Sequence, residues 1–131
     1  RSVDLLPVLP AVIVAILIFL VILINEFPDL AANSQVHKRT LVVLLGMGRS
    51  AWIYRAVLAA SYFAAALMLA HRVTFLAGTF YLLTLPLAIF AMRGANSRDL
   101  AVRGQYGANR TTILLHTVGS LSLSAGLLAA F

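Results

Sequence analysis

Four long apolar stretches limit what this chain can fold into. They run from Leu5 to Ile24, from Trp52 to Ala70, from Val73 to Met92 and from Thr111 to Phe131, and together they contain one charged residue, Arg55. A membrane span needs ~20 largely apolar residues. In the whole chain 62% of residues are hydrophobic and 11% are charged, whereas soluble domains have about 45–50% and about 25%. The sequence therefore predicts an integral membrane protein.

The expected fold class is all-α, because helices satisfy their own backbone hydrogen bonds inside a bilayer. We expect a single four-helix transmembrane domain over residues 1–131, with spans at about 5–25, 51–70, 73–92 and 111–131 and polar loops at 26–50 and 93–110. Pro86 in the third span predicts a kink, and Pro28 permits one after the first. Small residues in the second and fourth spans favour close helix packing. The large aliphatic residues of the first span suit contact with lipid or with a bound isoprenoid, quinone or pigment.

The basic residues predict the orientation in the membrane. Four spans put both termini and the His71–Arg72 turn on one side and both polar loops on the other. The loop side contains most of the Lys and Arg residues: Lys38, Arg39, Arg49, Arg93, Arg98, Arg103 and Arg110. Cytoplasmic loops are enriched in Lys and Arg. We therefore expect a multi-pass protein of the cell membrane with loops 26–50 and 93–110 in the cytoplasm. The net charge of +6 is then a topology signal, and we expect no nucleic-acid partner.

The polar segment after the first span indicates a ligand site. Asn25, Asp29 and Asn33 recur every four residues, so a continuing helix would stack them on one face. Carboxylate and amide oxygens suit Mg²⁺, which usually shares itself between one or two carboxylates and substrate phosphates. Cations after such a cluster would neutralise a diphosphate. We predict Asp29 as a metal ligand supported by Asn25 and Asn33, and Lys38 and Arg39 as diphosphate-binding residues.

The segment from Asn25 to Gly46 resembles the second aspartate-rich motif of the UbiA-type intramembrane prenyltransferases. It is most similar to the dihydroxynaphthoate polyprenyltransferases of menaquinone biosynthesis, where N-x-x-x-D-x-x-x-D-x-x-x-G-K-x-T-L-x-V-x-x-G is typical. The residues at matching positions are Asn25, Asp29, Lys38, Thr40, Leu41, Val43 and Gly46. The resemblance implies a larger helical bundle, of which this chain would supply the last four helices, and a magnesium-dependent reaction of a polyprenyl diphosphate.

The chain departs from this pattern at two positions and lacks the first aspartate-rich motif of the family. Asn33 stands where the family has a second aspartate, and His37 stands where it has the glycine before Lys38. Two divalent ions beside a diphosphate need more carboxylate than Asp29 alone supplies. We therefore expect no activity from this chain alone, and we assign no catalytic residue. The start at Arg1 fits either a processed chain or a piece of a longer one.

The sequence fits two interpretations, one in which the chain is part of an enzyme and one in which it is not catalytic. In the first, it is the C-terminal half of a UbiA-type polyprenyl transferase, which moves a prenyl group from its diphosphate to an aromatic acceptor with Mg²⁺. Its partner would be the N-terminal half of the bundle. In the second, it is a non-catalytic transmembrane accessory subunit of a larger membrane protein complex. Both interpretations place it in a lipid bilayer.

Arg55 is the charged residue inside a predicted span. At the middle of a bilayer, arginine costs about 2.5–3.5 kcal/mol on insertion scales. We therefore expect Arg55 near the cytoplasmic end of its helix, with the guanidinium reaching either Asp29 or the membrane interface.

Overall fold

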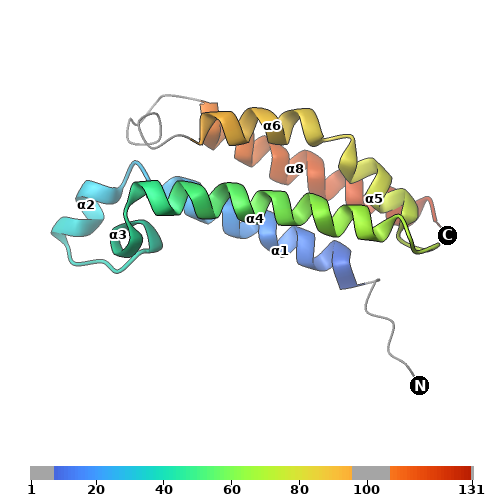
Figure 1. The fold of residues 1–131 in the computed structure, drawn as a ribbon, viewed down its shortest axis with the longest axis horizontal. Coiled ribbons are helices and arrows are strands. Elements are labelled where there is room, and N and C mark those ends of the chain that lie inside the picture. Colours follow the sequence, from blue (N-terminus) through green and yellow to red (C-terminus); the bar gives the residue numbers. More distant parts are fainter. Residues whose placement is uncertain (1–7, 96–106, 131) are drawn as a thin grey trace, which may run out of the picture.

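The computed structural model describes residues 8–95 and 107–130, and every regular element within them is a helix. The elements are α1 (Leu9–Glu26), α2 (Leu30–Gln35), α3 (Leu41–Leu45), α4 (Met47–Met68), α5 (Phe75–Leu82), α6 (Leu85–Gly94) and α8 (Gly107–Leu128). The all-helical class is confirmed for this part of the chain. Figure 1 shows α1, α4, α8 and the α5–α6 pair packed alongside one another.

Among the described residues, three helices are long and apolar enough to cross a membrane, namely α1, α4 and α8. The α5–α6 pair passes the same test when it is taken together, although it bends by 48° at a short break. Residues 8–95 and 107–130 therefore contain three candidate spans, or four if the bent pair is one span. Pro86 lies in the first turn of α6, so the predicted kink of the third span is confirmed.

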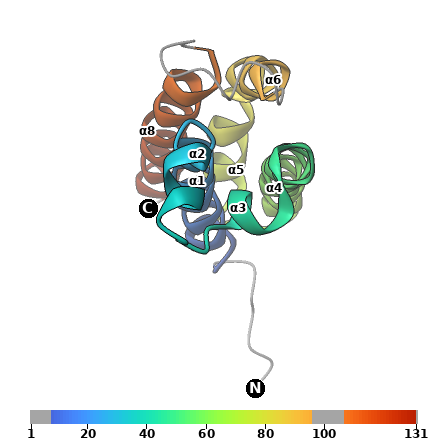
Figure 2. The same cartoon turned by 90° about the vertical axis from the view of Figure 1, so that its left-hand side faces the viewer.

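The first polar loop and the described ends of the second lie at the same end of the bundle. There α1 ends, α2 and α3 pack, α4 and α8 begin and α6 ends (Figure 1). We call this the polar end and define it by residues 25–49, 93–95 and 107–110. Figure 2 views the bundle from it. The opposite end holds the turn between α4 and α5. Arg98 and Arg103 of the second loop lie outside the described residues.

Local sequence signals explain where these helices begin and end. Pro10 lies in the first turn of α1, where its missing N–H costs nothing, and α1 ends before Pro28. Thr40 caps α3, since its side-chain oxygen accepts the backbone N–H of Val43 (3.3 Å). Gly46 separates α3 from α4 with φ +77°, a backbone conformation that favours glycine.

Helix α1 has one face inside the bundle and one face outside. Its buried large residues, which pack against α4 and α8, are Ile13, Leu17, Leu20, Leu23 and Ile24. The opposite face exposes Val12, Ile18, Phe19 and Ile22. The sequence predicts contact with lipid or a ligand for this span as a whole, but only its outer face is available for such contact.

Two glycines bring α5 close to its neighbours. A Cβ atom added at Gly126 of α8 would lie 2.5 Å from the backbone nitrogen of Ala77 in α5. One added at Gly78 of α5 would lie 2.8 Å from the carbonyl oxygen of Ala65 in α4. Neither helix pair could keep its spacing with a larger residue there. The expectation that small residues in the second and fourth spans allow close approach is confirmed at Ala65 and Gly126.

Buried hydroxyl groups join α4 to the helices around it. The pairs are Tyr54 with Thr112 of α8 (2.6 Å), Ser61 with Tyr81 of α5 (2.9 Å), and Tyr62 with Thr84 at the α5–α6 break (2.7 Å). In each pair the Ser or Thr hydroxyl donates its own proton to a helix carbonyl, so the tyrosine hydroxyl is the donor between helices. Hydrogen bonds of this kind satisfy polar groups that would be costly to bury alone.

Candidate functional site

The residues predicted to bind metal lie at the polar end, on two helices rather than on one. Asn25 is in the last turn of α1, whereas Asn33 belongs to α2, and a turn from Phe27 to Asp29 separates the helices. The condition for one shared face, a helix that continues from Asn25 to Asn33, is therefore not met. Pro28 explains the break, since proline interrupts the helical hydrogen-bond pattern.

Asp29 and Asn33 are one helical turn apart at the start of α2. Asp29 is the residue before the helix, and its backbone oxygen accepts the Asn33 N–H (2.8 Å). Both residues are half-buried. The two side chains that the sequence analysis assigned to one metal site are thus held by the same short helix.

The Asn25 side chain is held by hydrogen bonds at both its nitrogen and its oxygen. Its nitrogen Nδ2 donates to the carbonyl of Val21 in the preceding turn (2.9 Å), and its oxygen Oδ1 accepts from Nδ2 of Asn109 in α8 (3.1 Å). Sequence reasoning missed Asn109. No local pattern around it indicates a contact with a residue so distant in the chain.

The two predicted diphosphate-binding residues directly follow the C-terminal cap of α2. His37 has φ +53°, and its N–H donates to Ser34 O (3.3 Å), while the Lys38 N–H donates to Asn33 O (2.9 Å). These two bonds around a left-handed residue form a Schellman motif. The family pattern has glycine at this position, which suits the left-handed conformation. Lys38 and Arg39 follow it, and both are exposed.

Glu26 is a second carboxylate at the polar end. Its Oε2 accepts the backbone N–H of Val42 near the start of α3 (3.4 Å), so it links the end of α1 to α3. Glu26 is not among the site residues predicted from the sequence. Within residues 8–95 and 107–130, no group of three or more His, Cys, Asp and Glu side chains gathers in a way that could hold a metal ion.

Arg55 contacts the end of another helix. Its Nη2 donates to the backbone oxygen of Ala95, the residue that follows α6 (2.6 Å). The last carbonyl groups of a helix lack partners within it and attract cations. The sequence predicts Asp29 or the membrane interface as the partner of Arg55. The hydrogen bond to the Ala95 carbonyl was not predicted.

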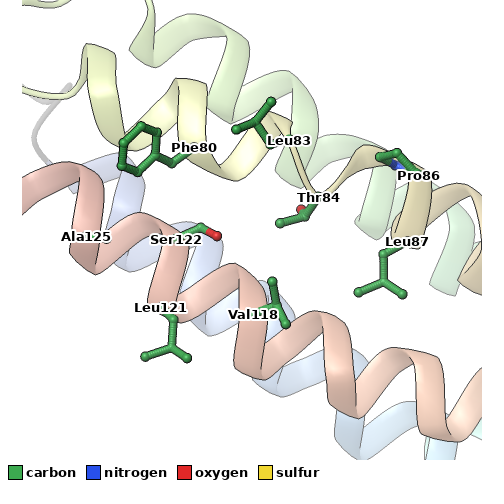
Figure 3. Close-up of a pocket in the computed structure, with 9 residues that line it drawn as sticks. All are labelled: Phe80, Leu83, Thr84, Pro86, Leu87, Val118, Leu121, Ser122 and Ala125. Carbon is green, nitrogen blue, oxygen red and sulfur yellow. The ribbon is translucent and has the colours of Figure 1, made fainter.

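An open pocket of about 630 Å³ lies between α8 and the α5–α6 pair, at the bend of that pair. Figure 3 shows the side chains that line it: Phe80, Leu83, Thr84, Pro86, Leu87, Val118, Leu121, Ser122 and Ala125. Most are apolar, and the hydroxyls of Thr84 and Ser122 are the polar groups among them. Such a lining suits an apolar ligand rather than a charged one.

No family model, no curated protein and no solved structure matches the chain.

Proposed function

We propose that the chain is a multi-pass membrane protein and forms the C-terminal half of a UbiA-type polyprenyl transferase. One observation carries the proposal, namely the segment from Asn25 to Gly46, which matches the family pattern at most of its characteristic positions. Support comes from the location of this segment at one end of an apolar helical bundle. A diphosphate there would stay in contact with water, while an attached prenyl chain would lie among the helices.

The polar end holds part of a site for magnesium and diphosphate. Asp29 is the metal ligand, Asn25 and Asn33 support it, and Lys38 and Arg39 bind the diphosphate. The donors are all oxygens, and one carboxylate with substrate phosphates is a usual environment for Mg²⁺, so the residues fit one ion shared with the substrate. Bound magnesium would stabilise negative charge on the departing diphosphate.

The chain alone has no prenyltransferase activity, because this end offers too little negative charge for two metal ions. Purified chain incubated with a polyprenyl diphosphate, Mg²⁺ and dihydroxynaphthoate should therefore yield no prenylated product, and Asn33→Asp should not restore turnover. Formation of product would show that Asp29 suffices as the carboxylate ligand, that Glu26 supplements it, or that several copies complete the site, and it would overturn this part of the proposal.

Metal-dependent diphosphate binding tests the site itself. Electron paramagnetic resonance of Mn²⁺ with inorganic diphosphate should show binding to the purified chain and loss of that binding in Asp29→Asn. Lys38→Ala should weaken the diphosphate dependence. The matched control is Arg72→Ala, an exposed cation at the opposite end of the bundle, which should change nothing.

The second candidate function is a non-catalytic transmembrane subunit of a larger membrane complex. Asn33, at the position of a family aspartate, favours it. Absence of Mn²⁺ and diphosphate binding in the assay above would support this candidate and contradict the first.

The proposed orientation has loops 26–50 and 93–110 in the cytoplasm of the cell. The chain contains no cysteine, so single introduced cysteines report their side of the membrane without background. Gln35→Cys lies on exposed α2 and should be labelled only after the membrane is opened, whereas Arg72→Cys should be labelled on intact cells. The reverse pattern would contradict the orientation.

A further inference from the structure

Asn109, in the first turn of α8, joins the motif to a helix far away in the sequence. Its side-chain nitrogen donates to the Asn25 side-chain oxygen (3.1 Å) and, over a longer distance, to the Ile24 backbone oxygen (3.4 Å). The Asn25 nitrogen is bonded in turn to the Val21 carbonyl. The orientation of the Asn25 amide therefore depends on α8 as well as on α1.

The contact with Ile24 follows from Pro28. In an uninterrupted helix, the N–H of residue 28 would donate to the carbonyl oxygen of residue 24, but proline has no N–H. Carbonyl groups at a helix end need partners from elsewhere. Because Asn109 donates to this carbonyl, the same side chain compensates for Pro28 and orients Asn25.

We propose that Asn109 is a positioning residue for the metal–diphosphate site, an inference that rests on the function proposed above. An amide oxygen has two lone pairs, so the Asn25 oxygen accepts from Asn109 with one and keeps the other for a metal ion. Groups that hydrogen-bond to a metal ligand set its orientation, and their loss typically weakens metal binding ~10–100-fold. Asn109 acts through Asn25 and does not touch the ion.

The test measures Mn²⁺ affinity of the purified full chain with inorganic diphosphate. Pro28 stays in place, because its replacement would let α1 continue and would move Asp29. We expect Asn109→Ala to lower Mn²⁺ affinity ~10–100-fold and to change the thermal midpoint little. Thr117→Ala is the matched control, because its hydroxyl bonds within its own helix, and it should change neither quantity.

Further variants separate the outcomes. Asn25→Ala and the double variant Asn25→Ala/Asn109→Ala should bind Mn²⁺ equally weakly, since Asn109 acts through Asn25. Tighter binding in Asn109→Asp would mean that residue 109 contacts the ion, and the positioning role would be wrong. Unchanged affinity in Asn109→Ala would overturn the inference and leave the proposed function intact. If the unsubstituted chain binds no Mn²⁺, both proposals fail.

Discussion

The part of the chain that the structure describes has two helix breaks next to prolines, one inside the bundle and one at the polar end, and they are stabilised differently. At the inner break, the Thr84 backbone N–H and hydroxyl both donate to the Tyr81 carbonyl (2.9 and 2.7 Å), and the buried Tyr62 hydroxyl pairs with the Thr84 oxygen. At the polar end, the carbonyl left free by Pro28 has one long bond from Asn109 (3.4 Å).

The difference follows from the surroundings of each break. Thr84, Tyr62 and Tyr81 are buried, and polar groups away from water need partners within the protein. Asn25 is exposed and Asn109 is partly exposed, so water is an alternative partner at the polar end. The inner break is thus part of the packed structure, whereas the outer break leaves polar side chains accessible to a ligand.

Packing of α5 against α8, about two helical turns before the inner break, should be the most sensitive feature. Gly126→Leu puts a side chain where the Ala77 backbone of α5 lies, so α5 and α8 must separate. We expect a loss of about 3 kcal/mol in unfolding free energy, measured by thermal or denaturant unfolding in detergent. Gly48→Ala is the control, since nothing lies within 4 Å of an added Cβ there. Equal stability of the two variants would contradict the close approach.

The hydroxyl at the inner break should have the next largest effect. Thr84→Val removes the bond to Tyr81 and leaves the Tyr62 hydroxyl buried without its acceptor. A loss of about 1–2 kcal/mol is expected, with little further loss when Tyr62→Phe is added. Thr79→Val is the control, because the Thr79 hydroxyl bonds to the carbonyl of Phe75 in its own helix. An equally large loss of stability in Thr79→Val would mean that the hydrogen bonds of Thr84 contribute no more than a hydroxyl bonded within its own helix.

A substitution at the polar end should have the smallest effect on the free energy of unfolding, and it should stabilise the protein rather than destabilise it. His37 has a left-handed backbone conformation, which costs a residue other than glycine roughly 1–2 kcal/mol. Glycine avoids this cost, but it loses more conformational entropy on folding, so the net gain is smaller. His37→Gly should stabilise the end of α2 by about 0.5–1 kcal/mol. Trypsin should therefore cut more slowly after the exposed Lys38 and Arg39. Faster cutting would show that the Schellman motif does not protect this segment.

Several features could be predicted from the sequence because they depend on residues close together in the chain. The all-helical class follows from the length of the apolar stretches, and the bend of the third span follows from the ring of Pro86. The grouping of Asp29 with Asn33 also follows, since four residues make about one helical turn. The same spacing rule failed for Asn25, because Pro28 ends the helix between them.

Only the tertiary structure decided which distant groups meet. Asn109 reaches Asn25, Arg55 reaches the carbonyl of Ala95, and Tyr62 reaches Thr84. A hydrogen bond between helices depends on how each helix is rotated and shifted against its neighbour, and that depends on all the packed side chains at once. Sequence alone determined which long segments are apolar and helical, but it did not indicate that α2 and α3 form within the expected loop 26–50. Packing determined which polar side chains face one another.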